Sequence, residues 1–304
     1  MQDLARWVAA HPVEVLIAAV LPLMLLVWLL SLVLQRLRQP LWRSLLYRWQ
    51  RLARHPRLRS LLQRFPALGR IEAPAATAGG YLLLDLLFGF ALALGAATTF
   101  FALADEIGID EGMGRFDRAL AAELAASASP ELLQGFARIT RLADVEVQTV
   151  ICIGVAALLL WRRRRLLAVT WIAAVAGNGL MTRLLKWIFA RDRPLHDHGV
   201  ALAHGYSFPS GHASGAMAVY GMLAYLLIRA TPGLWHVPIA LSTAAVVLSV
   251  GYSRVVLQVH YFSDVLAGFV VAAGWLVVCI AAARLIRAHR RALAVADRGP
   301  AGGG

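Results

Sequence analysis

Seven stretches of mostly apolar residues in this chain of 304 residues are long enough, or nearly long enough, to cross a membrane. A hydrocarbon core about 30 Å thick requires about 20 such residues in an α-helix. None of the stretches alternates apolar and polar residues as barrel strands do. The sequence therefore predicts an all-α fold, a polytopic membrane helical bundle. The stretches are residues 13–34, 81–104, 146–161, 166–189, 213–229, 237–253 and 262–283, and the third needs its flanks to complete a span.

The composition excludes two broad classes of protein. Hydrophobic residues make up 60% of the chain and charged residues only 15%, which differs from soluble globular domains and from disordered chains. The net charge of +13 is high enough to suggest a nucleic-acid partner, but basic residues of membrane proteins usually mark cytoplasmic loops. We therefore expect a lipid bilayer as partner and no nucleic acid.

Arginine is concentrated in zones between the apolar stretches. Residues 36–70 hold ten Arg and no acid, residues 162–165 are four Arg, and residues 284–298 hold five Arg and one Asp. Residues 105–144 carry eight acids and four Arg. If all seven stretches cross the membrane, the three basic zones share one side and the acidic segment lies on the other. The positive-inside rule then predicts a plasma-membrane protein with its N-terminus outside and its C-terminus in the cytoplasm.

The same pattern divides the chain into four parts. We expect an N-terminal transmembrane anchor at 1–35, a basic amphipathic segment with a linker at 36–78, a helical core at 79–290 and a disordered tail at 291–304. The linker is the run from Pro74 to Gly80. The basic segment is either an interfacial helix on anionic headgroups or a loop that only fixes topology. The first apolar stretch lacks signal-peptide features and is interpreted as a retained anchor.

Polar residues at the ends of the spans form three groups, and such residues at membrane depth are usually functional. The first group runs from Lys186 to Arg193 and Pro194. The two cations are seven residues apart, about two helical turns, so we expect them on one helix face, with the helix ending at the proline. Under the predicted topology, all three groups lie at the outer side of the membrane.

The second and third groups supply a helix N-terminus and two histidines. Pro209, Ser210, Gly211 and His212 directly precede an apolar run, so Ser210 can cap that helix at a site suited to anions. Ser253 and Arg254 are followed by His260 and Asp264. The last two are four residues apart, within reach on one helical face, where the carboxylate can orient the imidazole.

Together these residues predict an oxyanion site with a nucleophilic or acid–base pair. Arginine suits bidentate binding of phosphate, and lysine supplies a point charge. The sequence has no P-loop, no zinc-ligand spacing and no carboxylate cluster for magnesium. We therefore expect chemistry without a cofactor or a metal. The alternative, that these polar groups only join helices, does not explain three cations and two histidines at one membrane face.

The ordered motifs Lys-x6-Arg-Pro, Pro-Ser-Gly-His and Ser-Arg-x5-His-x3-Asp resemble the three signature motifs of the type 2 phosphatidic acid phosphatase (PAP2) superfamily. That family includes membrane lipid phosphatases, glucose-6-phosphatase and vanadium haloperoxidases. The resemblance covers residues 80–285 and implies a six-helix PAP2-like core. The first span and residues 36–70 lie outside it.

The resemblance also implies a role for each motif residue. His260 is the expected nucleophile, Asp264 its partner, and His212 the acid that protonates the leaving oxygen and later activates water. The remaining motif residues are expected to bind the phosphoryl oxygens; they are Lys186, Arg193, Ser210, Gly211 and Arg254.

The implied activity is hydrolysis of a lipid phosphate or diphosphate at the outer interface. Undecaprenyl diphosphate, phosphatidylglycerol phosphate, phosphatidate and lipid A phosphate all remain candidates. Three alternatives stay open: a lipid-linked phosphotransferase, a haloperoxidase, and a transporter or scramblase with a relict site. The sequence leaves open the oligomeric state and the roles of Asp144, Arg183, Arg191 and Asp192, while His196, His198 and His204 are interpreted as loop histidines.

Overall fold

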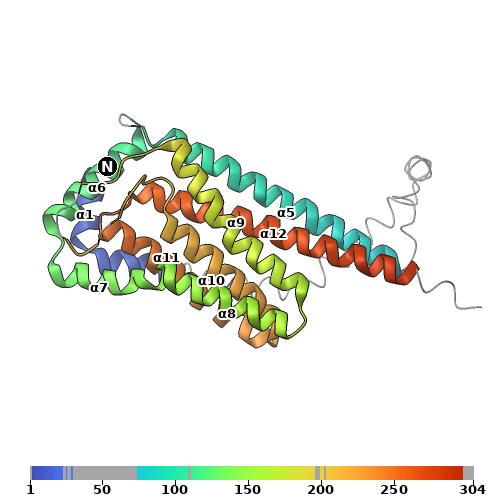
Figure 1. Ribbon diagram of the computed structural model, residues 1–304. Helices are drawn as coiled ribbons and strands as arrows, with labels where there is room; N and C mark the ends of the chain where they lie inside the picture. Colours follow the sequence, from blue (N-terminus) through green and yellow to red (C-terminus); the bar gives the residue numbers. More distant parts are fainter. Residues whose placement is uncertain are drawn as a thin grey trace, which may run out of the picture.

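The computed structural model describes residues 2–22, 25, 29, 74–108, 111–195, 199–201 and 203–296 (Figure 1). In this part of the chain all regular structure is helical and no strand occurs. The α-helices are α1 (Gln2–Ala10), α5 (Pro74–Asp105), α6 (Gly112–Ser127), α7 (Pro130–Thr140), α8 (Val145–Trp161), α9 (Arg165–Phe189), α10 (Gly211–Ala230), α11 (His236–Val256) and α12 (Phe262–Ala296). Two short 3-10 helices, η1 (Arg141–Ala143) and η2 (Gly233–Trp235), join α7 to α8 and α10 to α11.

Six helical segments of the described residues are long and apolar enough to cross a membrane, which confirms the last six predicted spans. They are Leu86–Asp105, Pro130–Trp161, Arg165–Phe189, Gly211–Ala230, Gly233–Val256 and Phe262–Arg290. The short third stretch is completed by α7 and η1, as its length required. At the start of the chain, Gln2–Ala10 and Pro12–Pro22 form a pair bent by 95°. Ten residues of the first predicted span, 23, 24, 26–28 and 30–34, lie outside the described residues.

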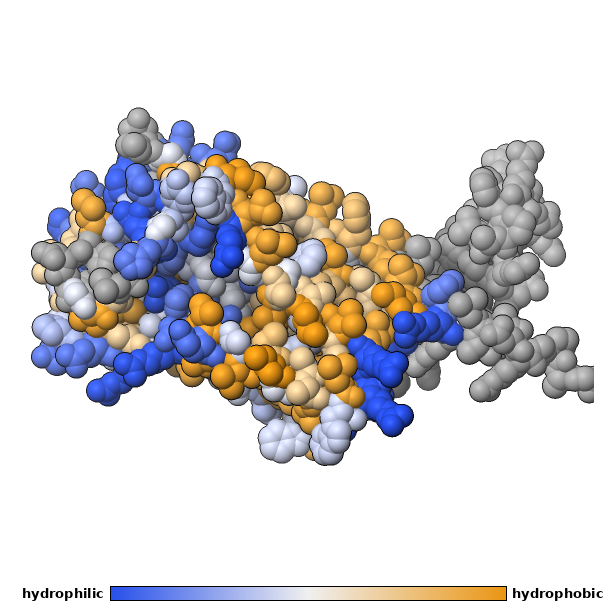
Figure 2. Space-filling model, in the orientation of Figure 1, coloured by the Kyte–Doolittle hydropathy of each residue, from blue (hydrophilic) through white to orange (hydrophobic). Residues whose placement is uncertain are grey.

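The surface carries the apolar band that a bilayer requires. Phe88 and Phe90 on α5 are 66% and 67% exposed, and Trp161 at the end of α8 is 77% exposed. Figure 2 shows this band between two hydrophilic ends. Large apolar side chains exposed in such number are stable in lipid and costly in water, so the chain is a multi-pass membrane protein.

Helix α12 runs through the bundle and packs against α5, α9 and α10 (Figure 1). Trp171 of α9, Met222 of α10 and Leu276 of α12 form part of one buried cluster between these helices. Gly268 of α12 allows a close approach to α10, because a Cβ there would lie 2.7 Å from the Ser210 carbonyl oxygen. This contact places the start of α10 directly beside the start of α12.

Helices α1, α6 and α7 cover one end of the bundle (Figure 1). Ala5 and Ala9 of α1 are buried against Leu120 and Leu124 of α6. The opposite end carries the 162–165 turn and the C-terminal part of α12, so two of the predicted basic zones do lie together. The third zone, 36–70, lies outside the described residues.

Two boundaries differ from the sequence prediction. Residues 74–80, predicted as a linker, form the start of α5; a proline at the first helical position is compatible with a helix because its missing N–H would have no intrahelical partner. Residues 291–296, predicted as part of a disordered tail, continue α12, since the run contains good helix formers and neither Gly nor Pro. The remaining tail, 297–304, lies outside the described residues.

Candidate active site

The three motif groups meet at the end of the bundle that α6 and α7 cover. Lys186 lies in the last turn of α9 and Arg254 in the last turn of α11. Ser210 is the N-cap of α10, and His260 lies two residues before α12. Because neighbouring helices run in opposite directions, these two C-terminal and two N-terminal ends come together.

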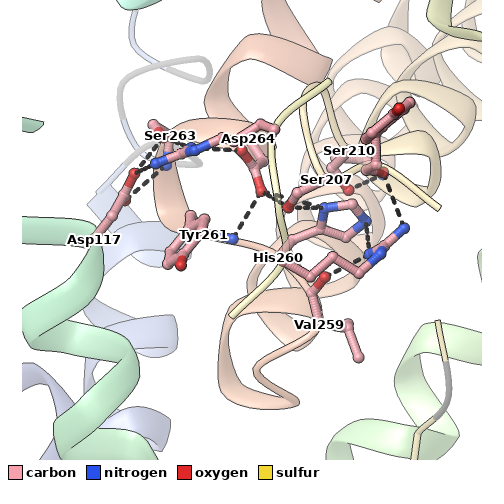
Figure 3. Close-up of polar contacts among 12 residues, drawn as sticks. Asp117, Ser207, Ser210, Val259, His260, Tyr261, Ser263 and Asp264 are labelled. Atoms are coloured by element: carbon pink, nitrogen blue, oxygen red, sulfur yellow. Dashed lines mark hydrogen bonds and ion pairs between the residues drawn. The ribbon is translucent and has the colours of Figure 1, made fainter. Parts of the chain in front are cut away.

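His260 and Asp264 form the buried centre of this site (Figure 3). Nδ1 of His260 lies 3.3 Å from Oδ2 of Asp264. The Asp264 carboxylate also accepts a hydrogen bond from the Tyr261 N–H at 2.9 Å and one from the Ser207 hydroxyl. An ionised carboxylate can only accept, so it favours the tautomer with hydrogen on Nδ1. Nε2 of His260 therefore carries the lone pair.

Burial keeps His260 neutral. Its side chain is 3% exposed, and this burial lowers the pKa of the imidazole to about 3, although the Asp264 carboxylate acts in the opposite direction. Arg193 and Lys186 lower the pKa further. A neutral imidazole with an oriented lone pair is the form that a nucleophilic histidine requires.

The contact between His260 and Asp264 was predicted, but not its geometry. We expected both residues on one helical face, whereas α12 begins at Phe262 and leaves His260 outside the helix. The backbone N–H of His260 donates instead to the Arg254 carbonyl, at 3.2 Å. The turn between α11 and α12 thus holds the histidine, and the carboxylate reaches back from the first turn of α12.

Arg193 faces Nε2 of His260 from a loop. Helix α9 ends at Phe189, and Ala190 has a left-handed backbone with φ 44°. The prediction of a helix continuing to Pro194 is therefore wrong, and helical spacing does not align Arg193 with Lys186. The Arg193 Nη1 lies 3.2 Å from Nε2 of His260 and 2.5 Å from the Val259 carbonyl oxygen.

Lys186 and Arg193 nevertheless converge, because both bind the same loop. The Lys186 ammonium donates to the carbonyls of Tyr206 at 2.5 Å and Ser207 at 3.2 Å. The Arg193 guanidinium donates to the carbonyls of Gly205, His204 and Tyr206. Burial lowers the pKa of Arg193, yet a guanidinium remains charged at any physiological pH.

The start of α10 has the predicted cap. The Ser210 hydroxyl accepts a hydrogen bond from the Ala213 N–H at 3.4 Å, and its own N–H donates to the Asp264 carbonyl at 2.9 Å. Gly211 is the first helical residue, so its N–H belongs to those that a helix leaves without an intrahelical partner. Nε2 of His212, in the same turn, lies 3.2 Å from Oδ1 of Asp144. Asp144, whose role the sequence left open, thus contacts a motif histidine.

Arg254 completes the cation group. Its side chain is buried, and Nη1 donates to the Thr140 hydroxyl at 2.8 Å. Its Nε is a buried donor with no hydrogen-bond partner among the described residues. Lys186, Arg193 and Arg254 lie close enough together to interact electrostatically. The structure therefore brings all eight predicted site residues to one region.

Sequence reasoning left the role of Arg191 open and missed Asp117 and Ser263, and these three residues hold Asp264 in place. Arg191 donates to Asp264 at 2.6 Å and to Asp117 of α6 at 2.9 Å, and its guanidinium lies over the Tyr261 ring at 4.3 Å. Asp117 also accepts from the Ser263 N–H at 3.1 Å and from the Ser263 hydroxyl. Figure 3 shows Asp117, Ser263 and Asp264 in one group of contacts, and Arg191 joins them by donating a hydrogen bond to all three.

Burial and polar contacts act in opposite directions on the Asp117 carboxyl. Burial raises its pKa, the Ser263 hydroxyl and the Arg191 charge lower it, and the pKa stays above its ordinary value. The available sequence signal was an acid at 117 between Phe116 and Arg118 in a helix with an otherwise apolar buried face. That signal does not identify a partner 74 residues away.

Two predicted loop histidines, at 196 and 198, lie outside the described residues. The His204 carbonyl binds Arg193, as noted above, but its imidazole has no assigned contact in the site. Among the described residues, no group of three or more His, Cys, Asp or Glu side chains is placed to hold a metal ion.

Comparison with known proteins assigns this region to a family. The model of the PAP2 superfamily matches residues 166–287. This region belongs to the PAP2 superfamily. It contains all eight predicted site residues, whereas Asp117, Thr140 and Asp144 precede it.

The relatives of the PAP2 region are phosphatases. Phosphatidylglycerophosphatase B of Bacillus subtilis is 40% identical over 94 residues, which are 30% of this chain and 45% of that protein. Lipid A 1-phosphatase of Rhizobium etli is 32% identical over 123 residues, 36% of this chain and 49% of that protein. The matches thus span about half the length of these relatives.

A solved structure extends the likeness beyond the PAP2 region. The crystal structure of a transmembrane PAP2-type phosphatidylglycerolphosphate phosphatase from Bacillus subtilis is 25% identical to this chain. It aligns with a TM-score of 0.56 over 62% of this chain and 93% of that one. The chain has the fold of a PAP2 membrane phosphatase.

Proposed function

We propose that this chain is an integral membrane phosphatase that hydrolyses a lipid phosphate or diphosphate through a phosphohistidine intermediate. The observation that carries the proposal is the environment of His260. Asp264 holds its Nδ1, its Nε2 lone pair faces Arg193, and burial keeps the ring neutral. Lys186, Arg193 and Arg254 supply the positive charge that a phosphoryl group requires, so the proposal includes no metal ion.

In the first step, Nε2 of His260 attacks phosphorus and the bond between phosphorus and the leaving oxygen breaks. His212, in its protonated form, gives its proton to that oxygen. Asp144 lies 3.2 Å from Nε2 of His212, and a neighbouring carboxylate stabilises an imidazolium. The three cations and the N–H of Gly211 stabilise the charge that develops on the phosphoryl oxygens.

In the second step, water attacks the phosphohistidine. His212, now neutral, accepts a proton from the water, and the bond between phosphorus and Nε2 breaks. Inorganic phosphate leaves, and His260 and His212 return to their starting protonation states. Asp264 keeps its hydrogen bond to Nδ1 throughout, so the histidine does not have to reorient between the two steps.

The surroundings of the site favour a lipid substrate. Trp187 and Ile188, which directly follow Lys186, are 74% and 67% exposed, and Leu195 is 95% exposed. These side chains place apolar surface beside the phosphate-binding cations, as a phosphate ester with an acyl or prenyl tail requires. The activities of the relatives make phosphatidylglycerol phosphate and lipid A phosphate candidate substrates, beside undecaprenyl diphosphate and phosphatidate.

The orientation is part of the proposal. The arginine-rich end of the bundle would face the cytoplasm of a plasma membrane and the site would face outward, as the positive-inside rule predicts. Cysteine labelling in intact cells tests this, with an introduced cysteine at exposed Arg162 and another at exposed Leu195. The proposed orientation requires that only the cysteine at 195 reacts with a membrane-impermeant reagent.

A phosphate-release screen tests the activity. The full chain in detergent, with a chelator present, is given polyprenyl, glycerolipid and lipid A phosphates. His260→Ala should abolish phosphate release and phosphoenzyme formation. The control is His236→Ala, because His236 lies at the opposite end of α11 and contacts only the Thr231 carbonyl in the described hydrogen bonds. Full activity of His260→Ala, or a strict metal requirement, would contradict the mechanism.

Two alternatives predict different products. A phosphotransferase would pass the phosphoryl group from His260 to a lipid or sugar, so acceptor labelling would exceed phosphate release. A transporter or scramblase with a relict site would release no phosphate from any substrate while moving lipid between leaflets. The complete set of polar contacts around His260 favours hydrolysis or transfer over a relict site.

A further inference from the structure

A positively charged cavity lies at the end of the bundle opposite the candidate active site. It has a volume of about 460 Å³ and is lined by residues of α9, α10, α12 and the turn before α9. Its six cationic side chains are Arg163, Arg164, Arg165, Arg229, Arg287 and Arg290. We call these six residues the arginine pocket.

The positive charge of the arginine pocket is not balanced within its own segments. Residues 147–191, 211–256 and 265–296 contain no acidic residue. The six arginines therefore bring positive charge to one cavity from segments that carry no acid.

Topology alone does not require this arrangement. The positive-inside rule asks for basic residues in cytoplasmic loops, and it is satisfied when they point apart into water. Here arginines from three separate stretches of chain gather around one cavity, where like charges repel. Arg163 also has a left-handed backbone, with φ 55°, which is uncommon for a residue with a side chain. An anion between these side chains would offset the repulsion.

Aromatic residues place the arginine pocket at the depth of lipid headgroups. Trp161 and Trp235 at this end are 77% and 53% exposed, and exposed tryptophans are enriched at the membrane–water interface. Arg162 lies over the Trp161 ring at 5.6 Å. Basic pockets between transmembrane helices at this depth suit phosphate headgroups, and guanidinium groups bind phosphate oxygens in pairs.

We propose that the arginine pocket binds the phosphate headgroup of an anionic phospholipid in the leaflet opposite the active site. The recognised chemistry is a phosphate diester with an acyl chain extending between α9 and its neighbours. Leu166 and Leu167, which also line the cavity, supply apolar contact for the start of that chain. This inference does not depend on the proposed catalytic activity.

The test measures binding of phosphatidylglycerol to the full chain in detergent, by native mass spectrometry and thermal shift. Phosphatidylcholine is the zwitterionic comparison, and inorganic phosphate at the same concentration is the lipid-free comparison. A triple variant, Arg163→Gln, Arg164→Gln and Arg229→Gln, removes half of the pocket's arginines. A matched triple variant removes the same charge at the opposite end, through exposed Arg6→Gln, Arg115→Gln and Arg138→Gln.

We expect phosphatidylglycerol to bind at least tenfold more tightly than phosphatidylcholine. The pocket variant should lose at least tenfold in phosphatidylglycerol affinity and the matched variant less than twofold. Equal binding of the two lipids, or equal losses in the two variants, would overturn the proposal. Equal stabilisation by inorganic phosphate would also overturn it, in favour of a soluble phosphate ligand.

A second measurement covers the case in which the pocket variant does not fold. Photo-crosslinkable phosphatidylglycerol is added to the unmodified protein, and labelled peptides are mapped by mass spectrometry. We expect labels within 161–170 and 226–235, reduced by excess unlabelled phosphatidylglycerol. Labels confined to other segments would refute the assignment.

Discussion

Asp117→Asn isolates the contribution of α6 to the catalytic pair, because it changes the charge of one carboxyl and almost no volume. Asp117 is 1% exposed. It accepts hydrogen bonds from Arg191, from the Ser263 N–H and from the Ser263 hydroxyl. The same Arg191 donates to Asp264 at 2.6 Å, so a change at 117 reaches the partner of His260 through one side chain.

The expected loss of stability follows from those contacts. An asparagine can still accept from the Ser263 N–H through its one oxygen, and the Ser263 hydroxyl can turn to accept from the amide. The donor of Arg191 that faced Oδ2 would then face an NH2 group. A buried, charge-assisted hydrogen bond is worth roughly 1.5–3 kcal/mol. Since Arg191 keeps Asp264 as a partner, we expect about 2–3 kcal/mol, below the full cost of isolating a buried charge.

The measurements are thermal unfolding in detergent and steady-state kinetics. A loss of this size corresponds to a fall in Tm of roughly 5–10 °C. If half of this free energy comes from the interaction that orients Asp264 towards His260, the activation barrier rises by that half and kcat falls about tenfold. KM should change little, because Asp117 touches none of the phosphate-binding residues.

Glu123→Gln is the matched control. Glu123 also lies on α6 and also pairs with an arginine, Arg6, at 3.4 Å, but the Arg6 side chain is 68% exposed. An exposed pair of this kind contributes about 0–1 kcal/mol, so Tm and kcat should stay near their original values. The reasoning is refuted if both variants behave alike, or if Asp117→Asn leaves kcat unchanged despite the lower Tm.

Three further outcomes are expected. His212→Ala should reduce hydrolysis of ordinary phosphate esters severely, and an ester whose leaving group has a very low pKa should partly restore the first step. A burst assay compares the two types of ester, and an equal loss of rate with both, or no loss with either, would refute the acid role. Lys186→Arg should lower activity at least tenfold, because the compact ammonium lies between the Tyr206 and Ser207 carbonyls; unchanged phosphate release would show that a guanidinium serves equally. In the folded chain the pKa of His260 is lowered to about 3, whereas the unfolded residue titrates near its ordinary value of about 6.5. His260 therefore does not lower the free energy of unfolding above pH 6.5, and it lowers this free energy increasingly as the pH falls towards 3. At pH 5 the cost is about 2 kcal/mol, so His260→Gln should lose less stability than the original chain between pH 7 and pH 5, and equal losses in unfolding experiments would contradict a buried neutral imidazole.

The amino-acid sequence alone determined the class of fold and the end of the bundle where the site lies. The length of an apolar stretch is a local property of the sequence, so six spans could be predicted from the hydropathy pattern. The positions of the motifs placed Lys186, Ser210, Arg254 and His260 at the ends of these spans. The cap at Ser210 also followed from the sequence, because capping depends on residues three positions apart.

Only the tertiary structure decided how the charges are held. Arg193 reaches His260 from a loop rather than along α9, and Arg191 joins Asp117 to Asp264, although Asp117 and Ser263 are 146 residues apart. Thr140 and Asp144, from the segment between α7 and α8, complete the surroundings of Arg254 and His212. Such contacts leave no periodic signal, because the partner of a buried charge is set by which helices pack together. Lys186 illustrates both contributions. The sequence identified it as the one lysine of the chain, and the structure places its ammonium against the two backbone carbonyls of Tyr206 and Ser207.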